Sequence, residues 1–144
     1  MLTVRLICVG NLKEKYWRDA FSEYEKRLSR FCRFETVEIP ESEIEREGNE
    51  ILKKKAGYIA ALCIEGKALS SEDFAAFIER KSFDFSKFTF IIGGSTGLSE
   101  KVKEASDIKI SFSPMTFPHQ LMRVIFSEQL YRAFTILNNV TYHK

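Results

Sequence analysis

FIIGGSTGLSE, residues Phe90–Glu100, passes from a strand-forming pattern to a helix-forming one within a few positions. An apolar run that favours a β-strand stops at two adjacent glycines, and a third, Gly97, comes just before a serine that can begin a helix. Glycines leave backbone N–H and C=O groups accessible, which suits a flat polar ligand such as adenine. A tight turn without a ligand explains the glycines equally well. The spacing is a poor match to the dinucleotide fingerprint, and the Gly-Lys-Ser/Thr of a Walker P-loop is absent.

Strand and helix patterns alternate along the whole chain around this turn. Strands are expected at residues 3–9, 34–39, 58–64, 88–92 and 108–112, the third ending before Gly66. Helices are expected at 14–31, from a Ser42/Glu45 capping box to about 55, after Ser70 or Ser71, at 99–105 and at 118–137. Long crossovers predict an α/β fold in which a mainly parallel five-stranded sheet has helices on both faces.

Ligands of such sheets gather beyond the carboxyl ends of the strands. This rule brings three segments to one edge: Leu62–Lys67, Gly93–Leu98 and Phe112–His119. The last contains SPMTFPHQ, whose prolines stiffen the backbone. It is either a rigid connection with a hydrophobic plug or one wall of an adenosine pocket. His119 is the only histidine of this loop, and a lone histidine is more often a structural residue than a catalyst.

Composition sets further limits. The 144 residues suit one domain. The net charge of +2 is too small for a surface that binds nucleic acid everywhere, but it is compatible with one local RNA-binding patch. The 3 cysteines have no CxxC spacing, and we expect no metal and no covalent intermediate. The N-terminal apolar run is too short to span a membrane and no signal peptide is visible, so we expect a cytoplasmic protein.

The last helix is apolar over more than half of its circumference, which predicts burial against the sheet and against a second copy of the chain. Arg132 interrupts this surface. It either pairs with Glu128 within the helix or faces an active site across a dimer. In the tail, Tyr142 could stack on an RNA base, although chain ends are usually uninformative.

The chain resembles the large-subunit ribosomal RNA methyltransferase H family, of the SPOUT class. The segments that carry the resemblance span the chain: VRLICVGNLK, FSEY, ETVEIP, LCIEGK, FIIGGSTGLS, MTFPHQLMRVIFSEQLYRA and YHK. Relatives often have an acidic residue at the position of Cys63. The resemblance implies one SPOUT domain over residues 1–144, a C-terminal trefoil knot and a homodimer that completes the site.

The resemblance also implies a function: methylation, with S-adenosyl-L-methionine, of N3 of pseudouridine-1915 in 23S rRNA of assembled ribosomes. A non-catalytic rRNA-binding assembly factor of the same fold is the alternative. A second, less favoured alternative is a nucleotide- or phosphate-binding enzyme. Candidates for holding the target nucleotide are His119, Arg132, Tyr142 and His143. The implied cofactor contacts are Leu62, Gly93, Gly94, Phe112, Ser113, Pro114, Met115, Thr116 and Phe117, to which the turn geometry adds Gly97.

Overall fold

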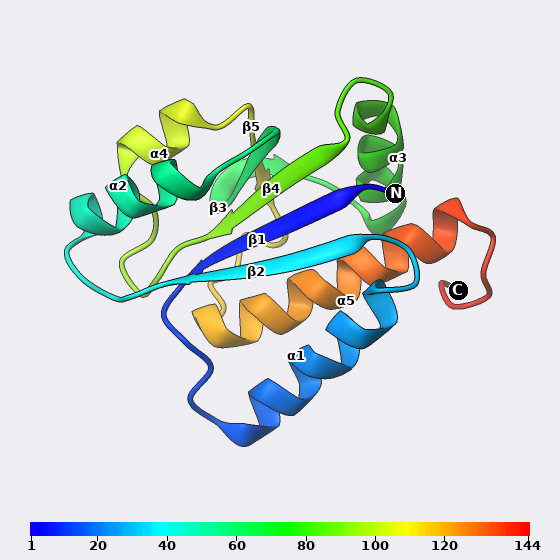
Figure 1. The fold of residues 1–144 in the computed structure, drawn as a ribbon, viewed down its shortest axis with the longest axis horizontal. Coiled ribbons are helices and arrows are strands. Elements are labelled where there is room, and N and C mark those ends of the chain that lie inside the picture. Colours follow the sequence, from blue (N-terminus) through cyan, green and yellow to red (C-terminus); the bar gives the residue numbers. More distant parts are fainter.

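All five strands of the computed structural model, which describes residues 1–144, run parallel in one sheet ordered β2-β1-β4-β3-β5 (Figure 1). The strands are β1 (Thr3–Val9), β2 (Arg33–Ile39), β3 (Tyr58–Ala68), β4 (Lys87–Ile92) and β5 (Ile108–Ser111). The helices are α1 (Lys15–Leu28), α2 (Ile44–Lys54), α3 (Ser71–Ser82), α4 (Glu100–Ala105) and α5 (His119–Leu137). The predicted α/β fold with a parallel sheet is confirmed.

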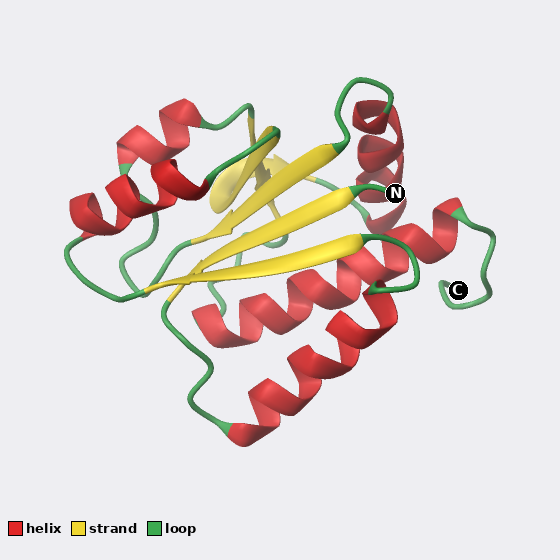
Figure 2. Cartoon of the chain, viewed as in Figure 1, coloured by secondary structure: helices red, strands yellow, loops and turns green.

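The helices form layers on both faces of the sheet (Figure 2). Helices α1, α3 and α5 enclose a core of 22 buried residues, and α2 and α4 cover a smaller core of 9. Strand β4 contributes side chains to both cores, since Phe88 and Phe90 belong to the larger core and Ile91 belongs to the smaller one. Alternate side chains of a strand point to opposite faces, so one central strand can anchor two layers. None of the helices combines the length and apolar character needed to cross a membrane.

Strand β3 is longer than predicted, because Gly66 continues it instead of ending it. Its register with β5 shifts between Leu62 and Lys67, and a Cβ on Gly66 would lie 2.6 Å from the Ile110 backbone. Glycine therefore permits a close approach of two strands at a bulge. The consequence is that Cys63, Ile64 and Glu65 belong to β3 and not to a free loop.

The start of α2 also differs from the prediction. Glu43 is the N-cap without a side-chain hydrogen bond, so the expected Ser42/Glu45 capping box does not form. Instead, the Ser42 N–H donates to the buried carboxylate of Glu47 at 2.8 Å. By contrast, the predicted cap at Ser70 is confirmed as a capping box with Asp73. Helix α1 ends at Leu28, short of the expected Phe31.

Candidate functional site

A cavity of about 230 Å³ lies beyond the carboxyl ends of β3, β4 and β5, where the three predicted segments converge. We call it the donor pocket. Nine of the predicted site residues line it: Leu62, Gly93, Gly97, Phe112, Ser113, Met115, Thr116, Phe117 and His119. Gly94 and Pro114 are not among the lining residues.

The glycine turn forms one wall of the donor pocket through its own backbone. Gly97 has a φ of +82°, and its N–H donates to the carbonyl of Gly94 at 3.0 Å. A Cβ on Gly93 would lie 2.6 Å from the carbonyl oxygen of Gly97, closer than real side chains come. Gly94 faces the opposite way, since its Cβ would meet the Val9 side chain at 3.0 Å. The prediction that Gly97 is required by the turn is confirmed.

The loop from Phe112 to Phe117 forms the facing wall. Ser111 Oγ donates to the Ser113 carbonyl at 3.0 Å, and the Met115 N–H donates to Ser113 Oγ at 2.9 Å. The Phe112 ring packs edge-on against Phe74, with ring centroids 5.5 Å apart. These contacts hold the loop in one shape, so the pocket has a fixed apolar wall interrupted by backbone polar groups.

The sequence did not identify two charged residues of the pocket, Glu65 on β3 and Lys103 on α4. Lys103 Nζ lies 2.5 Å from Glu65 Oε1. The hydrogen bond between them lowers the pKa of the Glu65 carboxyl and raises the pKa of the Lys103 ammonium. Cys63 also lines the pocket, and burial raises the pKa of its thiol, which makes it a weak nucleophile near neutral pH.

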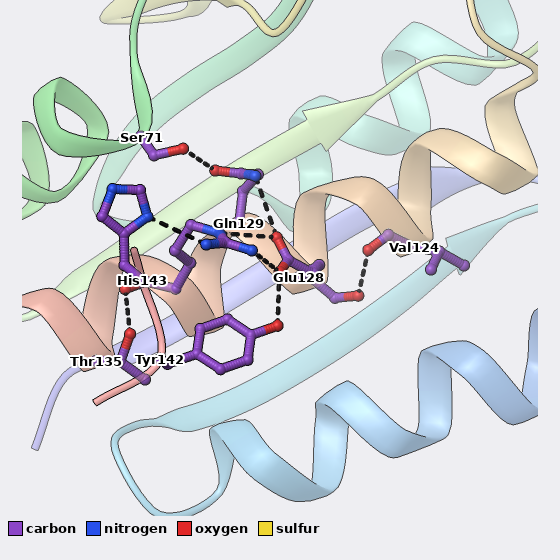
Figure 3. Close-up of polar contacts among 9 residues, drawn as sticks. Ser71, Val124, Glu128, Gln129, Thr135, Tyr142 and His143 are labelled. Atoms are coloured by element: carbon purple, nitrogen blue, oxygen red, sulfur yellow. Dashed lines mark hydrogen bonds and ion pairs between the residues drawn. The ribbon is translucent and has the colours of Figure 1, made fainter. Parts of the chain in front are cut away.

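A second group, here called the Arg132 cluster, contains the predicted Arg132, Tyr142 and His143 together with Glu72 and Glu128. Figure 3 shows Glu128, Tyr142 and His143 of this cluster. Arg132 donates to both carboxylate oxygens of Glu128, at 3.3 and 2.7 Å, which confirms the pair within the helix. The Tyr142 hydroxyl donates to Glu128 at 2.7 Å, and the Arg132 guanidinium lies 4.8 Å from the centre of the Tyr142 ring. One carboxylate therefore orients both an arginine and a tyrosine.

Hydrogen bonding selects the tautomer of a neutral His143 ring. Arg132 Nη1 lies 3.1 Å from His143 Nδ1. Since arginine can only donate, Nδ1 accepts, and the proton of a neutral ring is on Nε2, which faces the Glu72 carboxylate. Burial and then the bond to Glu128 raise the pKa of Tyr142, and the bond to Glu128 raises the pKa of Arg132. Tyr142 is therefore a neutral donor and Arg132 a permanent cation.

The two groups of predicted residues lie apart on one helix. His119 and Met122 of α5 line the donor pocket, whereas Arg132 lies further along the same helix, about 15 Å from Met122 at 1.5 Å per residue. Within one chain, the structure thus brings His119 to the pocket but leaves Arg132, Tyr142 and His143 outside it. No cluster of His, Cys, Asp or Glu side chains has the arrangement of a metal site.

A parallel sheet with a glycine-lined pocket beyond its carboxyl edge defines the class of α/β proteins that bind nucleotide-like ligands at that edge. Within this class, the chain belongs to the SPOUT methyltransferase family, because the family model described as "Predicted SPOUT methyltransferase" matches residues 2–143.

Individual relatives agree with this assignment. "Ribosomal RNA large subunit methyltransferase H" of Limosilactobacillus reuteri is 45% identical over 159 residues, covering 99% of this chain and 100% of the relative. The protein of that name from Caldicellulosiruptor saccharolyticus is 42% identical over 153 residues, covering 98% and 99%. A solved probable methylase family protein from Haemophilus influenzae, 12% identical, shares the fold at a TM-score of 0.58 over 99% of this chain and 70% of its own.

SPOUT methyltransferases take the methyl group from S-adenosyl-L-methionine, and this chain is accordingly a methyltransferase that uses this donor. The residues present fit the group. The adenine and ribose need apolar walls and a few backbone hydrogen-bonding groups, and the loop and the glycine turn supply both. Gly93 marks the place where no side chain can be accommodated.

Proposed function

We propose that this chain methylates large-subunit ribosomal RNA at N3 of a pseudouridine in a stem-loop, and that it acts on assembled ribosomes. The observation that carries the proposal is the convergence of Leu62, the glycine turn and the loop from Phe112 on one pocket. It is supported by relatives named as large-subunit rRNA methyltransferases that match the chain over 99% of its length.

The donor contacts that we propose are the predicted ones, in two roles. Leu62, Gly93, Gly97 and the lining residues of the loop contact the donor directly. Gly94 and Pro114 are assigned the shaping of the turn and of the loop, because they do not line the cavity. The donor supplies a methyl group that is already activated on a sulfonium, so the chain has to bind, orient and manage one proton.

Arg132, Tyr142 and His143 are proposed to hold the target nucleotide, and this requires a second copy of the chain. A distance of about 15 Å along α5 keeps them from the pocket of their own subunit. In a dimer with two-fold symmetry, antiparallel packing of two α5 helices places the Arg132 end of one subunit beside the pocket end of the other. We therefore propose a homodimer with composite sites.

Mixed dimers test this arrangement directly. A Gly93→Ala subunit lacks a working pocket and an Arg132→Met subunit lacks the arginine, so each homodimer is expected to be inactive. Random mixing after unfolding and refolding should restore about a quarter of wild-type activity if the sites are shared between subunits. No recovery from demonstrably mixed dimers would overturn the composite site, and light scattering that finds only monomers would overturn the dimer.

In the proposed mechanism, the chain positions N3 of the base close to, and in line with, the methyl group. Pseudouridine N3 is an imide N–H that must lose its proton before it can attack. Arg132 stabilises the negative charge that develops on the neighbouring base oxygens. Tyr142 donates its only O–H to Glu128, which fixes the position of the ring, and we propose that this ring stacks on the same nucleotide.

Two histidines are candidates for the proton acceptor. His119 lies in the donor pocket, with Nε2 3.7 Å from Glu41 Oε1. His143 already accepts a hydrogen bond from Arg132, so it can take the proton only when Arg132 turns to the substrate. A pH–rate profile that stays unchanged in both His119→Ala and His143→Ala would exclude both residues as the base.

Methyl transfer from radiolabelled S-adenosylmethionine is the experiment that tests the function. Ribosomes lacking the modification should accept label, and mapping should find it at N3 of one pseudouridine of large-subunit rRNA. Because we propose that the enzyme reads a shaped site, naked rRNA should accept far less. Donor binding without transfer to any ribosomal particle would instead favour the non-catalytic assembly factor.

Three further predictions belong to this proposal. They are the C-terminal trefoil knot, the organisation of residues 1–144 as one SPOUT domain and a cytoplasmic location. A knot predicts slow refolding, because threading must precede the final packing of α5. Refolding as fast as that of an unknotted α/β domain of this size would contradict it.

A further inference from the structure

Glu65 and Lys103 form an ion pair on the wall of an otherwise largely apolar pocket. The Lys103 side chain is 19% exposed, and its ammonium lies 2.5 Å from Glu65 and 3.6 Å from Glu100. The Glu65 side chain is 49% exposed, so it remains accessible to the solvent or to a ligand. The pair joins β3 to α4, two elements that flank the donor pocket.

Stability gives little reason for this pair. A partly exposed ion pair contributes little to stability, because solvent screens its charges and two long side chains lose conformational freedom. Some other pairs of this chain lie on the outer surface, such as Lys15–Asp19, whose side chains are 79% and 62% exposed. A ligand that fills the pocket would remove water from the Glu65–Lys103 pair and strengthen its interactions.

We propose that the Glu65–Lys103 pair binds the amino-acid end of S-adenosylmethionine, with Lys103 contacting the α-carboxylate and Glu65 contacting the α-ammonium. The inference rests on the proposed function, which places this donor in the pocket. The amino-acid end carries two adjacent opposite charges, and a fixed pair of opposite charges complements it without changing the net charge of the site. Lys103 retains donors for this contact, since an ammonium has three N–H groups.

The charges near the pair favour this assignment, with Lys103 on the α-carboxylate and Glu65 on the α-ammonium. Glu65 is surrounded by the cations Lys103 and Lys109, which lower the pKa of its carboxyl and keep it ionised as an acceptor. Lys103 is surrounded by Glu65 and Glu100, which raise the pKa of its ammonium and keep it charged. Each group is therefore held in the charge state that this contact needs.

A matched pair of ligands tests the proposal. S-Adenosylhomocysteine and 5′-methylthioadenosine share the adenosine and a neutral sulfur, but only the first has the amino-acid end. Calorimetry should find that Lys103→Met weakens binding of S-adenosylhomocysteine about tenfold and leaves methylthioadenosine unchanged within about twofold. Glu65→Gln should weaken the same ligand by less, because the glutamine oxygen still accepts a hydrogen bond.

Lys101→Met is the matched control, since Lys101 is exposed on the same helix but does not line the pocket. A thermal unfolding midpoint close to wild type shows that each variant is folded. The double variant Glu65→Lys/Lys103→Glu keeps an ion pair in the reverse order and should recover part of the lost affinity.

The outcomes separate the inference from the proposed function. Equal weakening of both ligands, or no weakening of either, overturns the amino-acid subsite while the donor pocket stands. If the wild-type protein binds neither S-adenosylmethionine nor S-adenosylhomocysteine, the result contradicts the proposed function itself, and the subsite with it. Selective weakening of S-adenosylhomocysteine in Lys103→Met, with Lys101→Met unchanged, supports the assignment.

Discussion

The donor pocket and the Arg132 cluster are built from different parts of the chain. The pocket is shaped largely by backbone, since the glycine turn closes through Gly97 N–H to the Gly94 carbonyl and leaves no space for a Cβ at Gly93. The Arg132 cluster is built from hydrogen-bonded and charged side chains of α3, α5 and the tail. Figure 3 shows Glu128, Tyr142 and His143 among them. Added atoms in the glycine turn should therefore weaken donor binding, and altered charges in the cluster should slow methyl transfer.

The largest expected effect on donor binding is that of a single methyl group in the glycine turn. In Gly93→Ala the new Cβ would lie 2.6 Å from the Gly97 carbonyl oxygen, so the backbone must move. We expect calorimetry to show donor affinity reduced about 100-fold. Gly97→Ala is the comparison within the same turn, since no protein atom lies within 4 Å of its Cβ and the fold loses only about 1 kcal/mol of stability through the strain of a φ of +82°. Equal losses of affinity would contradict a pocket shaped by the close approach at Gly93.

Removing a charge from the cluster should slow methyl transfer and leave donor binding intact, the opposite of what we expect for the glycine turn. In Arg132→Met the pocket is unchanged, so donor affinity should stay within about twofold of wild type, whereas the rate of methyl transfer should fall about 100-fold to 1,000-fold. Separate measurement of donor binding and of single-turnover transfer checks both halves. Arg46→Met is the control, because Arg46 is exposed on α2 and belongs to neither region. A parallel loss of donor affinity would show that the two regions are not independent.

This contrast also explains how much the sequence could predict. The glycine turn and the loop from Phe112 were predictable because turn chemistry is local. Glu65 and Lys103 were missed, because β3 continues past Gly66 only through its contact with β5. The chain separation between His143 and Glu72 is 71 residues, too long for any local pattern to pair them. Arg132, Tyr142 and His143 were identified by resemblance, but their distance from the pocket requires the course of α5 in three dimensions.

A smaller effect should follow when only the shared acceptor of the cluster is neutralised. Glu128→Gln keeps the shape of the side chain but weakens the bonds from both Arg132 and Tyr142. Because Glu128 is 19% exposed, the expected loss of stability is about 1 kcal/mol, and transfer should slow about tenfold with donor affinity unchanged. Denaturant unfolding and single-turnover kinetics measure the two quantities. Wild-type kinetics in this variant would show that Glu128 does not position Arg132 for transfer.

The smallest expected effect is a displaced titration in the tail. Burial, followed by donation to Glu128, raises the pKa of the Tyr142 phenol above its unfolded value of about 10. Since the neutral phenol is the form that docks, the stabilisation it provides is complete below that unfolded value and is lost as the pH rises through the raised pKa. Tyrosinate absorbance, taken as the difference between wild type and Tyr142→Phe, should show Tyr142 ionising later than tyrosine in the unfolded chain. In Glu128→Gln this ionisation should move back toward lower pH, and a titration identical in both proteins would mean that Glu128 does not hold the hydroxyl. The glycine turn has no corresponding signal, because backbone groups do not titrate, so this measurement reports on the cluster alone.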